Sequence, residues 1–307
     1  MSGIERDGGH DVAAPPTIIT IDVEEWFHGH NYLAHVPPST WDAQDLRVEK
    51  GTARCLDLLD RHGVKATFFV LGWTAERFPD LVREITRRGH EVGCHSYAHP
   101  EVFHLTADAF RADGERALAA LARAGVERPE GYRAPSFSIT PPVHHYLSVL
   151  QDLGFRYDCS LFPVRHPRYG QPRSPRTPFR LGPGRDDLVV IPMPTWRSFG
   201  VNVPFSGGGY LRLLPWPAFA FLRDQARRQG VPAIVYLHPW EMDDFRPEAK
   251  LAPWQRLRSQ GRQDTMPVKL ERILGQGRFA TLAEHAGNLR ARPDLPVRRP
   301  VAGRGLA

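Results

Sequence analysis

Short apolar runs alternate along this chain with longer segments in which apolar residues recur at helical spacing. The runs are rich in β-branched residues and have the length of strands buried on both faces. Strands are predicted at residues 17–23, 66–71, 91–94, 131–133, 156–159, 188–191 and 233–237, and helices at 48–61, 75–88, 107–124, 142–153, 217–228 and 268–274. Because strands and helices alternate, the pattern predicts βαβ units, a parallel sheet and an α/β fold.

Two segments depart from this alternation. Residues 162–184 are rich in Pro, Arg and Gly and show little periodicity, which is typical of a functional or mobile loop. Residues 205–210 (FSGGGY) read as a second flexible segment. No strand precedes these glycines at the spacing of a dinucleotide fingerprint, so a phosphate-binding loop is not predicted.

Composition indicates one globular domain with a basic end. The formal charge of the 307 residues is +6, and the last nineteen residues contain five Arg and one Asp. Such a tail is more often solvated than a nucleic-acid-binding arm, so no nucleic-acid partner is expected. We expect a disordered lead at residues 1–15, a catalytic domain at 16–288 and a basic flexible tail at 289–307.

The chain shows no sign of secretion or of a membrane span. Its three cysteines, Cys55, Cys94 and Cys159, have no paired spacing, so a disulfide framework is not implied and a reducing compartment fits. The first residues lack the apolar region of a signal peptide, and no apolar run is long enough to cross a bilayer. We predict a cytoplasmic protein.

Polar residues that can do chemistry follow several of the predicted strands. The carboxyl ends of barrel strands lie on one face, where active sites form. Residues distant in sequence would therefore meet there: Asp22, Glu24, Glu25, His95, His99, Arg133 and His238.

His95 and His99 are spaced so that a turn brings both imidazoles to one side. With a carboxylate from the first strand they would form a two-histidine, one-carboxylate metal site with open positions for water and substrate. Asp22 and Glu24 share a strand face; one would bind the metal and the other would act as base. Paired surface histidines and solvated acids at a helix start are the alternatives.

Hydrolysis of an amide also needs a group that protonates the leaving nitrogen. His238 is the best candidate, because an imidazole can carry a proton near neutral pH. Trp240 and Glu241 follow it closely and could line a sugar site, although a packing role is equally compatible with the sequence.

With these residues the chain resembles the polysaccharide deacetylases, carbohydrate esterase family four, and in particular the bacterial exopolysaccharide-associated branch whose first motif reads Asp-Val-Glu. The resemblance covers residues 17–282. It implies that Asp22 is the base and that Glu24, His95 and His99 bind the metal, with Glu25 as the alternative carboxylate. The family's commoner second Asp is Val23 here.

The later motifs also appear in the family's order. Tyr132-Arg133-Ala-Pro135-Ser136-Phe137 resembles the third motif, so Arg133 would hold the base and the Ser136 backbone would help to form an oxyanion hole. Leu237-His238 resembles the fifth motif, which makes His238 the general acid. Asp158 lies in the region of the fourth motif and would orient His238, but the rest of that motif is missing.

The resemblance implies a distorted parallel (β/α) barrel of about seven strands in a single domain. It further implies a divalent metal, zinc or a similar ion, and a substrate with N-acetylhexosamine units in a polysaccharide or its lipid-linked precursor. Ser136, Trp240 and Glu25 are expected to contact this glycan, and peripheral contact with a lipid-linked glycan is allowed. The alternatives are an allantoinase-like hydrolase of a small cyclic amide and a non-catalytic carbohydrate-binding homologue.

Overall fold

The computed structural model describes residues 15–182, 188–301 and 305–306, and its centre is a mainly parallel sheet. Seven consecutive strands run parallel in the order β10-β1-β2-β3-β4-β5-β7. They are β1 (Thr17–Val23), β2 (Thr67–Val70), β3 (Glu91–Cys94), β4 (Gly131–Tyr132), β5 (Tyr157–Asp158), β7 (Val189–Val190) and β10 (Ala233–Leu237). Each overlaps one predicted strand, so the predicted α/β barrel of about seven strands is confirmed.

β1 lies inside the sheet, between β10 and β2. All seven of its residues are buried, as its β-branched sequence predicts. Ile21 is paired with Leu237 of β10, and Asp22 is paired with Phe69 of β2. The carboxyl ends of these parallel strands therefore lie beside one another, and the residues that follow them face a common space.

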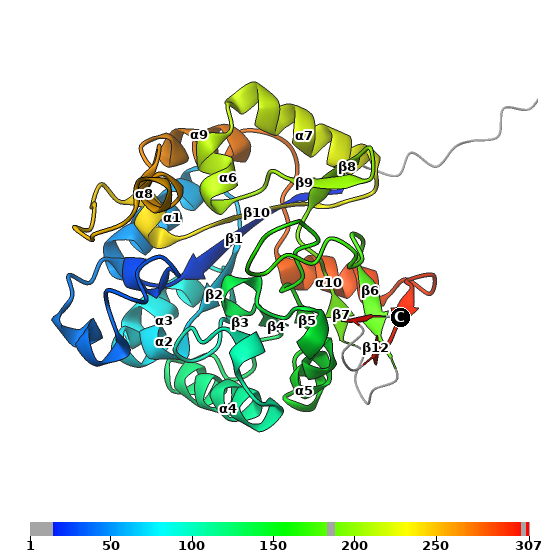
Figure 1. Cartoon of the computed structure of the whole chain (residues 1–307), viewed down its shortest axis with the longest axis horizontal. Helices are drawn as coiled ribbons and strands as arrows, with labels where there is room; N and C mark the ends of the chain where they lie inside the picture. The colour runs from blue at the N-terminus through cyan, green and yellow to red at the C-terminus, as the bar shows by residue number, and fades with distance from the viewer. Residues whose placement is uncertain (1–14, 183–187, 302–304, 307) are drawn as a thin grey trace, which may run out of the picture.

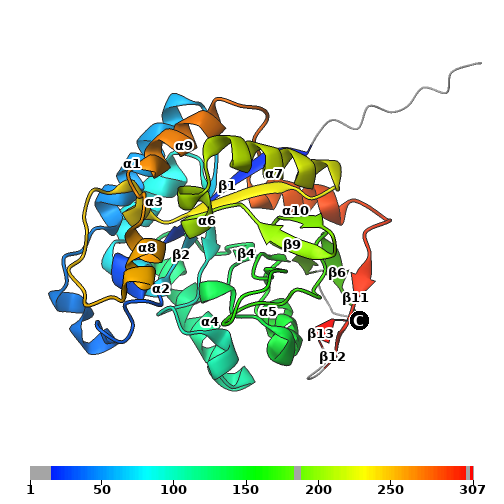
Figure 2. The same ribbon diagram turned by 45° about the horizontal axis from the view of Figure 1, so that its top comes forward.

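Helices surround the strands in Figures 1 and 2. Their bounds are α1 (Val48–Arg61), α2 (Gly72–Arg77), α3 (Pro79–Arg87), α4 (Ala107–Arg123), α5 (Leu147–Asp152), α6 (Gly208–Leu213), α7 (Trp216–Arg228), α8 (Pro253–Gln260), α9 (Thr265–Leu274) and α10 (Leu282–Arg290). Short 3-10 turns include η1 (Trp26–His28), η2 (Pro38–Ala43), η3 (Val102–His104), η4 (Pro135–Phe137), η5 (Pro141–Tyr146) and η6 (Pro239–Met242).

Local chemistry fixes several helix boundaries. Pro79 divides the single helix predicted at 75–88 into α2 and α3, because proline lacks the N–H that would continue the hydrogen-bond ladder. The Thr106 hydroxyl accepts a hydrogen bond from Ala109 N at the start of α4. Gly125 ends that helix with a φ of +97°, which glycine adopts without strain.

The sheet continues beyond β7 with two short strands, and one of them comes from the segment that was predicted to be a flexible tail. β6 (Phe179–Leu181) pairs antiparallel with β7, and β11 (Val297–Arg298) pairs parallel with β6. The prediction of a flexible tail at 289–307 is therefore wrong for its described residues up to 301. The guanidinium of Arg180 donates to the carbonyl of Arg292, and Leu295 is buried, so packing and backbone pairing order this basic segment.

The remaining strands form two small antiparallel ribbons. β8 (Thr195–Ser198) pairs with β9 (Val201–Pro204), and β12 (Pro300–Val301) pairs with β13 (Gly305–Leu306). Both lie apart from the seven parallel strands in the pairing order.

The glycine-rich segment that was expected to be flexible is packed against the sheet. Gly207 has a φ of +102°, and a Cβ atom there would lie 2.3 Å from the Tyr236 carbonyl oxygen. Only glycine permits this approach, and α6 begins directly afterwards. The segment at 162–184 likewise contributes β6, and its last two residues lie outside the described part of the chain.

Two expectations concern the ends of the chain and the membrane. The disordered lead predicted at 1–15 falls outside the described residues except for Pro15. Within the described ranges, every helix is too short or too polar to cross a bilayer.

Candidate active site

Five of the seven predicted strand-end residues line a common pocket of about 440 Å³. Asp22 and Glu24 reach it from the end of β1, His95 and His99 from the loop after β3, and His238 from the end of β10. Its volume is in the range of pockets that enclose a small organic ligand. Convergence of these side chains, which the parallel topology predicted, is therefore what the structure shows.

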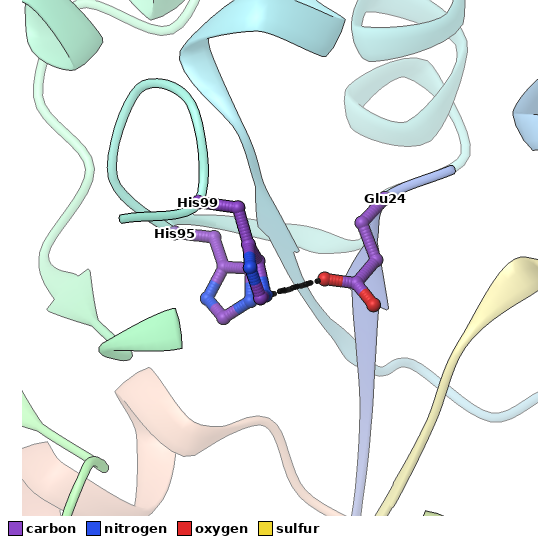
Figure 3. Close-up of side chains that lie close together, drawn as sticks. All are labelled: Glu24, His95 and His99. Carbon is purple, nitrogen blue, oxygen red and sulfur yellow. Dashed lines mark ion pairs between the residues drawn. The ribbon is translucent and has the colours of Figure 1, made fainter. Parts of the chain in front are cut away.

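Glu24, His95 and His99 form a compact set of three potential metal ligands. One ligand atom from each lies within 4.8 Å of the others. The Glu24 Oε2 atom is 2.8 Å from His99 Nε2 and 3.7 Å from His95 Nε2. Figure 3 shows the carboxylate facing both imidazoles, with the Glu24–His99 ion pair marked.

The surrounding chain orients the two imidazoles. His95 Nδ1 lies 2.7 Å from the Arg133 carbonyl oxygen, which leaves Nε2 facing Glu24. A hydrogen bond of this kind fixes the tautomer and ring orientation of metal-binding histidines. His99 has a φ of +59° and stacks on the buried His28 at 6.0 Å between ring centroids. A left-handed non-glycine residue is held only where its surroundings impose it.

The chemistry of this set fits a divalent cation. All three side chains are buried, with at most 6 % of their surface exposed, and the groups that face Glu24 Oε2 are the imidazoles of His95 and His99. Burying a carboxylate is costly unless a cation compensates its charge. Burial opposes the charge on Glu24, but the nearby imidazoles of His99 and His238 hold its pKa well below the usual range. Two imidazoles and one carboxylate match the ligands of catalytic zinc sites.

Asp22 lies in the same pocket and is fixed by a buried arginine. Arg133 Nη1 donates to Asp22 Oδ1 at 2.7 Å and to Thr20 Oγ1 at 2.8 Å. The guanidinium is fully buried and lies 4.4 Å from the centre of the Phe69 ring. Although burial opposes its charge, the Asp22 carboxylate raises the pKa of Arg133. The pair therefore keeps an aspartate oriented beside the three potential ligands.

The carboxylate of Glu241, in the turn that follows His238, orients the His238 ring. Its Nδ1 atom lies 2.9 Å from Glu241 Oε2, which also accepts from the His238 backbone N–H. The other oxygen of Glu241 lies 2.8 Å from Nε of the buried Arg212. His238 Nε2 is thereby directed toward the pocket, 3.7 Å from Glu24 Oε1.

This arrangement favours a protonated imidazole. Burial alone would lower the pKa of His238, but the charges of Glu24 and Glu241 outweigh it and raise that pKa to about 9. A cation bound at Glu24 would offset part of that carboxylate's contribution. Glu241, whose own pKa is lowered by Arg212 and His238 against the effect of burial, retains its charge beside Nδ1.

Two of the three predicted substrate contacts also line the pocket. Ser136 is half-buried and has a φ of +53°, in the loop after β4. The Trp240 ring stacks on His238 with centroids 4.9 Å apart. Both can meet a ligand that occupies the pocket.

The third predicted contact, Glu25, is placed elsewhere. Its carboxylate accepts hydrogen bonds from the backbone N–H groups of Arg47 and Val48, at 2.8 and 2.9 Å, at the start of α1. It is fully buried and does not line the pocket. The predictions that Glu25 contacts substrate or replaces Glu24 at the metal are therefore wrong, because the helix start satisfies this carboxylate.

Asp158 also differs from its predicted role. Its carboxylate accepts hydrogen bonds from the hydroxyl and the backbone N–H of Ser160, and it is fully buried outside the pocket. His238 Nδ1 is instead occupied by Glu241. Asp158 therefore does not orient His238. Four strands separate β5 from β10 in the sheet, so the two side chains belong to different parts of the rim.

From the burial of Asp158 we predict that the stability of the protein depends on pH. Burial raises the pKa of Asp158 from an ordinary 3.8 to about 7, against the hydrogen bonds from Ser160. The folded state therefore binds this proton more tightly than the unfolded state, and the stability that the bound proton contributes is lost as the pH rises from 3.8 to about 7. The Asp158→Asn substitution should remove this loss, which between about pH 5 and about pH 8 amounts to at most about 3 kcal/mol at about 1.4 kcal/mol per pKa unit.

Urea unfolding of both proteins at about pH 5 and about pH 8 measures the effect. The free energy of unfolding of the variant, minus that of the wild type, should be larger at the higher pH than at the lower pH. An unchanged difference in the free energy of unfolding would contradict a raised pKa at Asp158.

Sequence reasoning missed the support that Glu241 and Arg212 give to His238. The spacing of His238 and Glu241 in the turn after β10 is a signal that could have suggested the first contact. Arg212 has no such signal, because it comes from α6 in a region without a recognised motif.

Comparison with known families divides the chain into two matched parts. Residues 38–157 match the polysaccharide deacetylase family model. Residues 159–286 match a model described as a domain of unknown function, DUF3473. Glu24, His95 and His99 therefore lie before or within the first match, whereas Arg212, His238 and Glu241 lie within the second.

Several curated relatives match short parts of the chain. A peptidoglycan-N-acetylglucosamine deacetylase of Bacillus cereus is 41 % identical over 85 residues, which cover 28 % of this chain and 30 % of that protein. A chitooligosaccharide deacetylase of Rhizobium leguminosarum bv. trifolii is 47 % identical over 51 residues, covering 17 % and 24 %. The chain thus spans less than a third of each of these two relatives.

Solved structures share the fold over most of the chain. A protein from Mycobacterium smegmatis named as a polysaccharide deacetylase superposes with a TM-score of 0.63 at 23 % identity, covering 93 % of this chain and 94 % of the other. An allantoinase superposes with a TM-score of 0.57 at 17 % identity, covering 95 % and 99 %. At these identities the similarity establishes the fold.

Proposed function

Because this chain belongs to the polysaccharide deacetylase family, we propose that it is a metal-dependent hydrolase that removes N-acetyl groups from N-acetylhexosamine units. The observation that carries the proposal is the shared pocket in which Glu24, His95 and His99 lie beside Asp22 and opposite His238. Such a set combines ligands for a Lewis acid with a base and an acid, which amide hydrolysis requires.

Each side chain has a distinct task in this proposal. Glu24, His95 and His99 hold the cation. Asp22, oriented by Arg133, accepts a proton from the attacking water. His238, oriented by Glu241, gives a proton to the leaving amine. Water adds to the acetyl carbonyl, and the C–N bond then breaks to give acetate and the free amine. No covalent enzyme intermediate forms, because water attacks directly and no nucleophilic side chain is needed.

The cation supplies electrostatic chemistry that the side chains alone lack. A divalent ion lowers the pKa of water toward neutrality and polarises a carbonyl group. Zinc is proposed because imidazole with one carboxylate is a common zinc ligand set and leaves positions free for water and substrate. Ser136 lines the pocket, and its backbone N–H is proposed to stabilise the developing oxyanion.

The glycan is proposed to be a polysaccharide or its lipid-linked precursor, as in the exopolysaccharide-associated branch. Trp240 offers an aromatic face for a sugar ring. The cytoplasmic location and the peripheral contact with a lipid-linked glycan stay predictions.

A second candidate is hydrolysis of a small cyclic amide. It is supported by the limited pocket volume of about 440 Å³ and by the fold shared with an allantoinase. The metal ligands and the acid–base pair would act in the same way on a ring amide, so the two candidates differ only in the bond that is placed in the pocket.

Acetate release by the purified, zinc-loaded protein tests the proposal. N-acetylglucosamine oligomers, N-acetylglucosamine-containing acidic oligosaccharides and allantoin serve as substrates, each with and without a chelator. Acetate from the oligosaccharides that stops on chelation supports the deacetylase. Turnover of allantoin alone favours the cyclic-amide hydrolase, and glycan binding without turnover in metal-loaded protein would favour a non-catalytic homologue.

A further inference from the structure

The charged residues that line the pocket include three carboxylates and three arginines. The three carboxylates are Asp22, Glu24 and Glu241, and each has a cationic or imidazole partner described above. The arginines that line it are Arg168, Arg212 and Arg258, of which Arg212 is paired with Glu241. Arg168 and Arg258 are the two arginines of the lining that are not paired with a carboxylate of the pocket.

Arg258 is the more available of the two. Its side chain is exposed, and no carboxylate of the described residues lies within 4.0 Å of its guanidinium. Arg258 Nη2 lies 2.9 Å from His166 Nε2, so the guanidinium donates to a neutral imidazole. Its position at the pocket is thus fixed without its charge being neutralised.

Arg168 also lines the pocket, and its charge is only partly neutralised. Its Nε atom is 3.3 Å from Glu101 Oε1, and the same oxygen lies 3.2 Å from His30 Nδ1. Glu101 does not line the pocket, whereas Arg168 and His30 do. The single carboxylate of Glu101, outside the pocket, is therefore shared between two basic side chains of the pocket lining, Arg168 and His30.

Aromatic packing connects the two arginines into one surface. The His166 ring stacks on Tyr169 with centroids 3.8 Å apart, and Arg168 lies 5.5 Å from the centre of the same tyrosine ring. Arg258 is joined to this stack through His166. We call Arg168, His166, Tyr169 and Arg258 the basic wall. Guanidinium groups held this way present a planar fork that suits a carboxylate or phosphate.

We propose that the basic wall binds an anionic substituent of the glycan, a carboxylate or a phosphate, carried by the acetylated sugar or its neighbour. The inference rests on the proposed deacetylase function, because the same pocket must also accept the acetamido group. A neutral polymer would leave the charge of Arg258 without a partner, whereas an anion could be bound by the guanidiniums of the basic wall.

The test compares matched substrates and matched variants. Three probes carry N-acetylglucosamine: a neutral chitotetraose derivative, a tetrasaccharide that alternates glucuronate with N-acetylglucosamine, and N-acetylglucosamine 1-phosphate. Arg258→Gln removes one of the two guanidinium charges from the basic wall. Arg256→Gln removes one charge from the same helix, α8, at an exposed residue outside the pocket.

We expect the wild type to have a lower KM for at least one anionic probe than for the neutral one. Arg258→Gln should lower kcat/KM for that probe by about ten-fold, the loss of one charge-assisted hydrogen bond, and Arg256→Gln should change it little. The preferred anionic probe identifies the source of the charge, carboxylate or phosphate. Added salt should weaken the preference in the wild type because screening acts on charge recognition.

Calorimetric binding of the anionic tetrasaccharide and of N-acetylglucosamine 1-phosphate gives a readout that does not need turnover. Weaker binding of either probe by Arg258→Gln than by Arg256→Gln supports the basic wall. Equal kcat/KM on neutral and anionic probes, unaffected by Arg258→Gln, would overturn this inference while leaving the deacetylase proposal intact. Absence of acetate release from every probe would instead count against the deacetylase proposal.

Discussion

Replacing Asp22 with Asn is expected to lower kcat by about 10²–10⁴-fold, the usual contribution of a general base. Asn can still accept the hydrogen bond from Arg133 Nη1, which lies 2.7 Å from Asp22 Oδ1, so the orientation of the side chain should be retained. What it lacks is the ability to accept a proton from water. Steady-state acetate release measures the change, with KM expected to move much less than kcat.

The control for this variant is its metal content. Asp22 is not among the three ligand residues, so Asp22→Asn should bind zinc with the same stoichiometry as the wild type. It should lose some stability, because the buried Arg133 keeps its charge while its partner becomes neutral. A folded, zinc-loaded variant with unchanged kcat would refute the assignment of Asp22 as the base.

Replacing His238 with Gln is the second change with a large expected effect. The amide can fill the space but cannot deliver a proton to the leaving amine, so kcat should again fall by about 10²–10⁴-fold. Its effect on the pH profile separates it from Asp22→Asn. In the wild type, His238 must be protonated, and a raised pKa keeps the proton on the imidazole to higher pH.

The sign of the pH dependence follows from this. Activity of the wild type should fall as the pH rises through the pKa of His238, which Glu24 and Glu241 raise to about 9 against burial, or through a lower value when a cation offsets Glu24. This alkaline limb should be absent from the residual activity of His238→Gln. Glu241→Gln should keep the limb but move it to lower pH, because it removes a carboxylate 2.9 Å from Nδ1.

A profile of kcat/KM against pH for the three proteins is the measurement. An alkaline limb that is identical in the wild type and in Glu241→Gln would show that Glu241 serves packing only. An alkaline limb that persists in His238→Gln would assign the acid to another residue.

The sequence was informative where chemistry follows buried strands. β1 and β10 are recognisable from their apolar runs, and parallel strands must bring their carboxyl ends together. This is why the sequence alone could predict that Asp22, Glu24 and His238 lie in one pocket. His95 and His99 followed from their spacing after a third strand.

Side-chain partners within the rim could not be predicted in the same way. Glu25 stands next to Glu24 in sequence, yet its carboxylate turns to the backbone of Arg47 and Val48. Alternation along a strand cannot reveal this, because it depends on where a helix begins in three dimensions. Glu241 likewise has its role because Arg212, from a different helix, holds its second oxygen.

The edge of the sheet escaped prediction for a different reason. β6 and β11 contain three and two residues, and β11 follows a basic, proline-rich stretch. Runs this short show no periodicity, so the prediction for residues 289–307 rested on their composition, which is typical of a flexible tail. Contacts such as the hydrogen bond from Arg180 to the Arg292 carbonyl, which join distant segments, determine the order of this region.

The metal site is the centre of this account, and metal content measures it most directly. Protein stripped with a chelator, reloaded with zinc and dialysed should retain about one zinc ion per chain, as expected for a single three-residue site. Glu24→Gln and His99→Ala should each lose most of this zinc, whereas Glu25→Gln, which changes the neighbouring buried carboxylate outside the pocket, should retain it. Stoichiometric zinc in folded Glu24→Gln and His99→Ala, or none in the reloaded wild type, would contradict the account.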